Sequence, residues 1–176
     1  GIEKWKYNTA NWQEIQEESM SVGTDLHKKI EEYLKGNNII ASNLVETLFQ
    51  NMTPQLNKIN NIRCQEARMF EPNLRIAGTV DCIAEYNGEL AVIDFKTSKK
   101  PKPREWIEHY FVQCVAYACM FYELTGIPVK KLVIIMACEN GECVVYEERD
   151  KTKYIKLLTE YIREFVRDKL ESYGTK

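Results

Sequence analysis

Residues 78–97 read GTVDCIAEYNGELAVIDFKT, and this stretch decides the fold. Asn87-Gly88 in its middle is typical of a two-residue β-hairpin turn, because both turn positions require a positive φ. We therefore predict an antiparallel hairpin with strands over 75–86 and 89–97. The turn also sets the register, unless a bulge shifts it by one residue. The predicted pairs are Tyr86 with Glu89, Ala84 with Ala91, Cys82 with Ile93, Asp81 with Asp94, and Thr79 with Lys96.

Two aspartates and a lysine share one face of this apolar hairpin. Side chains alternate along a strand, so Asp94 and Lys96 point to one face, and Ile93 and Phe95 point to the other. Asp81 joins the first face in the predicted register, where opposed carboxylates destabilise a sheet unless a cation offsets them. One interpretation is a structural ion triad neutralised by Lys96. We favour the other, a divalent-cation site, because carboxylate oxygens are the ligands that Mg²⁺ prefers.

The other segments alternate between predicted helices and strands. Apolar spacing predicts helices over 23–34, 42–50, 104–124 and 152–172, and further strands over 62–70, 132–138 and 142–147. Gly36 ends the first helix, and Pro54 breaks or restarts the second, whose continuation reaches Ile59. This order predicts an α/β fold with a mixed central β-sheet flanked by helices. We expect a single domain over 1–176, with an N-terminal helical region over 1–60 and a core over 61–176.

Four ordered elements resemble the RecB-type branch of the PD-(D/E)XK nucleases, which includes single-strand exonucleases of phages and mitochondria. Gly78-Thr79-Val80-Asp81, twelve residues, then Asp94-Phe95-Lys96-Thr97 is similar to the core motif of that family. Gly23-Thr24-Asp25-Leu26-His27 resembles its N-terminal element, and Gln113-Cys114-Val115-Ala116-Tyr117 resembles its Q-x-x-x-Y helix. Glu66 corresponds to an acidic residue on the strand before the core. The resemblance covers residues 20–135 and implies a restriction-endonuclease-like core.

The resemblance also implies roles for individual residues. It implies a catalytic set of Asp81, Asp94, Lys96, Gln113 and Tyr117, and Mg²⁺ or Mn²⁺ held by His27, Asp81, Asp94 and the Phe95 carbonyl. Each of these residues has a plainer interpretation in the sequence. His27 shares a helical stripe with Ile30 and would then be a core residue, and Gln113 and Tyr117 would line the core. Glu66 would then lie on a solvated strand edge.

Six cysteines do not form a metal-cluster pattern. They stand at 64, 82, 114, 119, 138 and 143, without a CxxC pair. We expect them to be reduced thiols of an intracellular protein. Some RecB-type relatives hold an iron–sulfur cluster with three closely spaced cysteines near the C-terminus. The final predicted helix contains no cysteine, so we expect no iron–sulfur cluster.

The predicted partner is DNA, expected to be single-stranded, although the net charge of −2 does not favour a nucleic-acid partner. A local basic run of Lys99, Lys100, Lys102 and Arg104 follows the predicted catalytic strand, where it would hold phosphates or form a solvated loop. Aromatic residues of the N-terminal region could stack bases or belong to the core: Trp5, Tyr7, Trp12, Tyr33 and Phe49. No apolar run is long enough to span a membrane.

We therefore expect a metal-dependent exonuclease that hydrolyses DNA phosphodiesters in replication, recombination or repair. If the chain is phage-encoded, the expected location is the cytoplasm of the bacterial host. The first alternative is an endonuclease or flap nuclease on the same fold. The second alternative is a catalytically silent DNA-binding module, whose sequence mark would be a damaged Asp81, Asp94 and Lys96 set.

Overall fold

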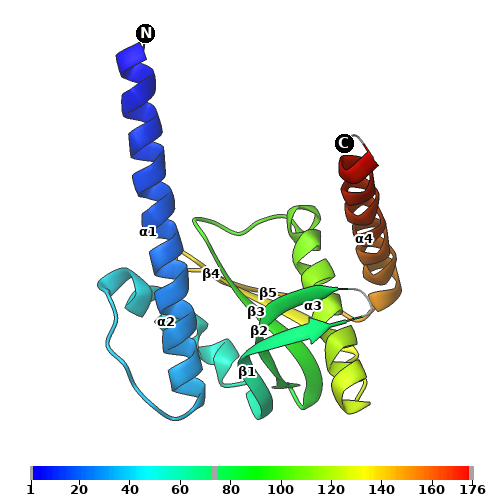
Figure 1. The fold of residues 1–176 in the computed structure, drawn as a ribbon. Helices are drawn as coiled ribbons and strands as arrows, with labels where there is room; N and C mark the ends of the chain where they lie inside the picture. Colours follow the sequence, from blue (N-terminus) through cyan, green and yellow to red (C-terminus); the bar gives the residue numbers. More distant parts are fainter. Residues whose placement is uncertain (1, 73–74, 175–176) are drawn as a thin grey trace.

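The computed structural model describes residues 2–72 and 75–174, with side chains described from residue 17 onward. Figure 1 shows a sheet with helices on both sides. The described helices are α1 (Ile2–Leu34), α2 (Asn43–Leu56), α3 (Arg104–Thr125) and α4 (Lys151–Gly174). The described strands are β1 (Ile59–Glu71), β2 (Ile76–Tyr86), β3 (Glu89–Ser98), β4 (Lys131–Cys138) and β5 (Cys143–Glu148).

The sheet has five strands in the order β1-β2-β3-β4-β5. β3 and β4 are parallel, joined through α3, and the other neighbours are antiparallel. The predicted mixed sheet flanked by helices is therefore confirmed. Asn87 and Gly88 both have positive φ, at 52° and 80°, as the predicted two-residue turn requires.

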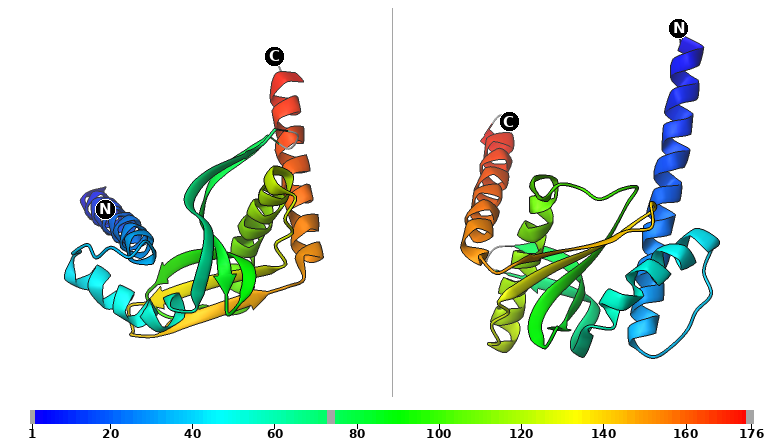
Figure 2. Two further views of the ribbon diagram at one scale, coloured as in Figure 1. Left: turned by 90° about the horizontal axis from the view of Figure 1, so that it is seen from below. Right: turned by 180° about the vertical axis from the view of Figure 1, so that it is seen from behind.

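Two hydrophobic cores lie on the two faces of the sheet. One lies between the sheet and the α3 and α4 side, with Ile83, Val92 and Phe111 fully buried. The other lies under α1 and α2, around residues such as Leu26 and Ile93. Figure 2 shows these helix pairs on opposite sides of the sheet. Successive residues of β3 enter opposite cores, which is the physical basis of the predicted alternation.

The N-terminal helices differ from the sequence prediction. α1 begins at Ile2 and not near residue 23, and its first turns extend beyond the sheet (Figure 1). An apolar stripe marks only the part of a helix that packs on a core, so periodicity identifies only about the last third of this helix. α2 continues through Pro54 to Leu56, because the proline lies in the last turn and buried Met52 and Leu56 hold that turn in place.

The strand that follows begins earlier than predicted. β1 starts at Ile59, so the expected continuation of a helix to that residue is wrong, and the sheet begins two residues before the expected boundary at 61. Its register with β2 shifts between Asn60 and Cys64. Asn61 and Glu66 both have positive φ, as expected where a strand is irregular.

The hairpin of β1 and β2 separates from the rest of the sheet. The pairs between β2 and β3 run from Tyr86–Glu89 to Cys82–Ile93, as predicted, and end there. From Val80 back to Ile76, the described partners of β2 belong to β1 alone. Figure 2 shows this half of the hairpin rising from the sheet toward α4. We call the point of separation, between Cys82 and Asp81, the fork.

Within the described part of the chain, no helix combines the length and the apolar character that crossing a bilayer requires.

Candidate active site

Asp81 lies at the fork, and its side chain replaces the backbone of β2 as a hydrogen-bond partner of β3. The predicted ladder pairs of Asp81 with Asp94 and of Thr79 with Lys96 are wrong: the β2–β3 ladder ends at Cys82, and Thr79 pairs with a residue of β1. Instead, Asp81 Oδ2 accepts the backbone N–H of Phe95 at 2.8 Å. A side-chain carboxylate thus satisfies an amide that the departing strand leaves without a partner.

His27 reaches Asp81 from the α1 side. Its Nε2 lies 3.0 Å from Asp81 Oδ2, and its Nδ1 lies 2.7 Å from the Gly23 carbonyl oxygen. Both neighbours are acceptors, an arrangement that favours the doubly protonated imidazolium. Burial opposes that charge, but the hydrogen bond and charge of Asp81 outweigh it and raise the pKa of His27 to about 9. Asp81 and His27 therefore form a charged pair across two layers.

Asp94 and Lys96 lie on the face of β3 opposite to that of Ile93 and Phe95, as the alternation predicts. Lys96 Nζ lies 3.2 Å from Asp94 Oδ2. Ile93 and Phe95, between and beside them, enter the other core. Burial and the charge of nearby Asp81 raise the pKa of Asp94 to about 7. Burial has the same tendency at Asp81, but the hydrogen bond from His27 lowers its pKa below the usual value. The two carboxyl groups therefore differ in acidity.

The donor set fits a divalent cation. Asp94 Oδ2 is buried, with the Lys96 ammonium 3.2 Å away. The charge of Asp81 still opposes the ionisation of Asp94, and a cation would remove that cost. Two aspartates and an imidazole are suitable ligands for Mg²⁺ or Mn²⁺. In the described structure no three His, Cys, Asp or Glu side chains already surround one point; His27 and Asp81 bind each other directly.

Glu66 and α1 border a cleft beside this pair. The cleft has a volume of about 580 Å³ and is lined by His27, Glu31, Glu66, Lys28 and residues of the preceding turn of α1. Burial and the charge of Asp81 raise the pKa of Glu66 to about 7. Glu66 thus lies within electrostatic reach of His27 and Asp81 and is not an isolated solvated residue. Glu31, one helical turn after His27, was not singled out from the sequence, although the spacing of four indicates the shared face.

The predicted Q-x-x-x-Y helix contributes differently from the expectation. Gln113 is exposed and makes no hydrogen bond to another described residue, so the core interpretation does not hold for it and its catalytic role stays a prediction. Tyr110 contacts Lys96, with its ring centroid 4.4 Å from Lys96 Nζ. Tyr117 packs on Gly78 so closely that a Cβ on this glycine would lie 2.6 Å from the Tyr117 hydroxyl. That close approach is a physical reason for glycine in the Gly78–Asp81 stretch.

The predicted DNA-contact run divides into two parts. Lys99 and Lys100 are exposed. Arg104 holds α3 to β5, because it donates to the Glu147 carbonyl at 3.0 Å and pairs with Glu148 at 3.2 Å. Lys102 is half-buried, and its carbonyl accepts a hydrogen bond from Tyr146. Arg104 is therefore committed to a contact within the protein, and the contact of the three lysines with DNA stays a prediction.

The predicted stacking residues also divide. Tyr33 packs edge-to-face on Phe49 with ring centroids 5.1 Å apart, and its hydroxyl donates to Asn57. These two rings belong to the contact between α1 and α2, which is the core interpretation. The side chains of Trp5, Tyr7 and Trp12 lie outside the described part of the structure. All six cysteines are free thiols in the structure, with Cys82, Cys114 and Cys138 buried and the other three partly buried.

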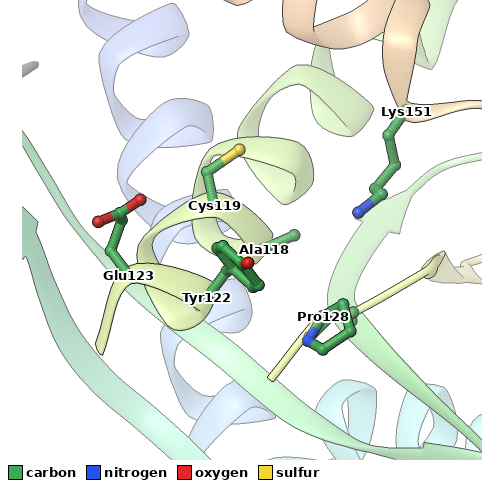
Figure 3. Close-up of a pocket in the computed structure, with 7 residues that line it drawn as sticks. Ala118, Cys119, Tyr122, Glu123, Pro128 and Lys151 are labelled. Carbon is green, nitrogen blue, oxygen red and sulfur yellow. The ribbon is translucent and has the colours of Figure 1, made fainter. Parts of the chain in front are cut away.

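A second small pocket lies on the far side of α3 (Figure 3). It has a volume of about 280 Å³ and lies between α3 and the start of α4, with Cys119, Tyr122 and Lys151 among its lining. Burial raises the pKa of the Cys119 thiol despite the nearby Lys151 charge, so the thiol stays protonated. A protonated thiol is a poor nucleophile, and the paired carboxylates at the fork remain the better candidate site.

Known proteins resemble this chain in sequence and in fold. It is 43% identical over 65 residues to human mitochondrial genome maintenance exonuclease 1, and 46% identical over 48 residues to the mouse protein. These segments cover 35% and 27% of this chain but only 18% and 14% of the relatives. A crystal structure of a protein from Eubacterium rectale assigned as an exonuclease matches with a TM-score of 0.62. At 12% identity, over 86% of this chain and 66% of that one, this match shows the restriction-endonuclease-like fold alone.

The remaining comparison concerns the family. The sequence model of the PD-(D/E)XK nuclease superfamily matches residues 6–173. The fork, with Asp81, Asp94 and Lys96, lies in the middle of the matched region. Because the match runs over nearly the whole chain, this protein belongs to the PD-(D/E)XK nuclease superfamily.

Proposed function

We propose that the chain is a metal-dependent exonuclease that hydrolyses single-stranded DNA, with a role in replication, recombination or repair. The net reaction adds water across a P–O bond, leaving a phosphate monoester on one fragment and a hydroxyl on the other. The word exonuclease in the names of the human and mouse relatives supports this choice of nuclease type. The catalytic residues would be Asp81, Asp94, Lys96, Gln113 and Tyr117.

The observation that carries the proposal is the pair of carboxylates at the fork, with Lys96 Nζ 3.2 Å from Asp94 Oδ2. Asp81 lies close enough for its charge to raise the pKa of Asp94, so the ion pair with Lys96 leaves the repulsion between the two carboxylates in place. A bound divalent cation would remove that repulsion. Asp81, Asp94, His27 and the Phe95 carbonyl would hold a Mg²⁺ or Mn²⁺ ion, which, when bound, polarises a phosphate and lowers the pKa of a water.

Each residue of the chain has a separate task in this proposal. Lys96 would donate to a phosphoryl oxygen as negative charge develops on it, which requires the ammonium to be held near the reacting phosphate. His27 would exchange the proton on Nε2 for the ion, since a ligand imidazole must be neutral. Exposed Lys99 and Lys100 would contact backbone phosphates farther along the strand.

Replacing Lys96 tests the proposal most directly. We expect Lys96→Ala to lower DNA cleavage about 10²–10³-fold, as the loss of one donor to a developing negative charge does. The melting temperature and Mn²⁺ affinity should change little, because the side chain is partly exposed. Lys130→Ala, an exposed lysine just before β4 at the other end of the sheet, is the matched control and should retain most activity. Cleavage by Lys96→Ala at the rate of the unmodified protein would exclude this centre.

The two rival functions predict different results. An endonuclease cuts a closed single-stranded circle, whereas the proposed exonuclease cuts only after the circle is opened. A silent DNA-binding module would cleave neither substrate, and Mg²⁺ or Mn²⁺ would leave its melting temperature unchanged. The proposed site predicts a higher melting temperature with either ion, because a ligand that binds only the folded state stabilises it.

A further inference from the structure

A groove lies between the start of β2 and the C-terminal helix. Its volume is about 970 Å³, and it is lined by Arg75, Ile76 and Ala77 on one side and by α4 residues from Leu158 to Tyr173 on the other. Figure 2 shows the rising hairpin approaching α4. The fork is the point where β2 leaves the sheet, and the groove borders the part of β2 that has left it. The separation of the hairpin from the sheet therefore underlies both the fork and the groove.

Aromatic rings in the groove are open to solvent. Tyr161, Phe165 and Tyr173 line it with 54%, 62% and 72% of their surfaces exposed. An exposed apolar patch of this kind typically marks an interaction site. Lys169 Nζ lies over the Phe165 ring, 5.5 Å from its centroid, so a cation and an aromatic face form one unit. These rings are therefore available to a partner.

The charge of the groove selects the kind of partner. Arg75 and Lys169 are the charged residues that line it, and the described lining contains no acidic side chain. Along α4 there are six Lys or Arg residues and four Asp or Glu residues, although the whole chain carries a net charge of −2. Exposed aromatic faces combined with cations and without carboxylates are typical of sites for single-stranded nucleic acid.

The groove and the candidate active site border the same strand, β2. Asp81 and Ala77 are four residues apart on β2, a distance of about 13 Å along an extended strand. This part of β2 is not paired with β3. Gly78, between them, is covered by Tyr117 of α3. A single strand of DNA held at the fork therefore needs to span only this distance along β2, past Tyr117, to enter the groove.

We propose that this groove binds the single-stranded DNA on one side of the scissile phosphate, an inference that rests on the proposed nuclease function. Bases stack on Tyr161, Phe165 and Tyr173, while Arg75 and Lys169 contact phosphates. Stacking tolerates any base because every base has a π-face, so the groove adds affinity without sequence preference.

Tyr161→Ala, Phe165→Ala and a matched control test the groove. Binding of a fluorescent single strand of about 16 nucleotides, the upper end of common site sizes, is measured by anisotropy in the full chain. We expect each variant to weaken binding about five-fold or more, the loss typical of one stacked base. Tyr122→Ala is the control, since Tyr122 is 53% exposed, as Tyr161 is, but lies in the pocket beyond α3. Photo-crosslinking from 5-iodouracil in the strand should label the groove tyrosines.

The outcomes separate this proposal from the proposed function. If the unmodified protein cleaves DNA but Tyr161→Ala and Phe165→Ala bind it as tightly as Tyr122→Ala does, the groove proposal alone is wrong. If the groove variants lose affinity but the unmodified protein cleaves nothing, only the catalytic proposal is wrong. Sedimentation gives a third result: a dimer that Phe165→Ala converts to a monomer, with unchanged DNA affinity, identifies the groove as a contact between two copies.

Discussion

The two halves of β2 differ in what they contribute to the molecule. From Cys82 to Tyr86 the strand pairs with β1 and β3, and its side chains enter both cores. From Ile76 to Val80 it pairs with β1 alone and borders the open groove beside α4. Asp81 stands between the halves and binds both Phe95 and His27. The comparison shows one strand that stabilises the fold with one half and opens a site with the other.

This difference has a physical cause at a single residue. A ladder that continued past Cys82 would place Asp81 directly opposite Asp94, where two carboxylates repel each other. By leaving the sheet there, β2 lets the Asp81 side chain accept the Phe95 amide and lets His27 enter from α1. We therefore expect substitutions at the fork to lower activity more than stability, and substitutions in the paired half to lower stability more than activity. The predictions below test this contrast, beginning with the largest expected effect.

Asp94→Asn should separate function from stability most strongly. We expect cleavage to fall by about 10³-fold, or about 4 kcal/mol of transition-state stabilisation, because the variant loses a charged ligand of the proposed ion. The stability of the ion-free protein should change by no more than about 1 kcal/mol, because the variant removes the repulsion from Asp81 and the ion pair with Lys96 together. Cleavage assays and urea denaturation measure the two effects. Asp150→Asn, at an exposed position, is the control and should change neither.

The same variant should change the pH dependence of stability. The pKa of Asp94 is raised to about 7 in the folded protein, so the folded state binds this proton more tightly than the unfolded state. Its contribution to stability is therefore present at low pH and is lost as the pH rises from about 4 to 7. Without metal, the melting temperature of the unmodified protein should decline over this range more than that of Asp94→Asn. Parallel curves for the two proteins would contradict the assigned environment of Asp94.

Ile83→Ala tests the paired half. Ile83 is fully buried in the core on the α3 side and pairs with both Cys64 and Val92. Its truncation should lower the free energy of unfolding by about 2–5 kcal/mol, because it leaves a cavity in a packed core. Activity per folded molecule should remain close to normal below the melting transition. Ile40→Ala is the control, since Ile40 is 94% exposed and should lose almost nothing. An activity loss larger than the unfolded fraction would remove the contrast between the halves.

The sequence predicts the paired half well and the fork poorly, for one reason. The Asn87-Gly88 turn is a local signal, and it fixes the register as far as the Cys82–Ile93 pair. Beyond that pair, the outcome depends on an amide of β3 that is satisfied by a side chain and on a histidine from α1. These are tertiary contacts, which turn chemistry does not encode. The residues of the site come together nonetheless, because alternation along β3 already places Asp94 and Lys96 on one face.

Local spacing does not encode tertiary contacts, and this also explains why residues of α3 behave differently from the prediction. Tyr110 and Gln113 are three residues apart and share a helical face, so spacing indicates both as candidates. Only side-chain geometry distinguishes them: the Tyr110 ring packs on Lys96 and Gln113 remains exposed. Arg104 belongs to a basic run by sequence, yet its two bonds to β5 give it a structural role. A run of charged residues in the sequence thus indicates composition alone, and the contacts in the structure decide the role of each residue.

Gly78→Ala tests the unpaired half. A Cβ at this position would lie 2.6 Å from the Tyr117 hydroxyl and 3.2 Å from the nearest ring carbon, so the tyrosine must move. We expect a loss of about 1–3 kcal/mol in stability, as is typical of overpacking. Adding Tyr117→Phe should restore part of it, because the closest atom is removed. Gly23→Ala is the control: nothing lies within 4 Å, and in a helix the change should stabilise by up to about 1 kcal/mol. Equal effects of the two alanines would contradict the close packing.

Tyr110→Leu should have the smallest effect and bears on how the fork holds its lysine. The Tyr110 ring lies over Lys96 Nζ and is packed in turn against His109, with ring centroids 4.0 Å apart. A cation over an aromatic face gains about 0.5–2 kcal/mol, so losing it should lower kcat about 2- to 30-fold. KM should change little, since Tyr110 is a positioning residue and the proposed DNA contacts lie elsewhere. Tyr110→Phe keeps the aromatic face and should retain normal kcat. If Phe impairs kcat as much as Leu, the hydroxyl is the active part; if only KM changes, Tyr110 acts on the strand rather than on Lys96.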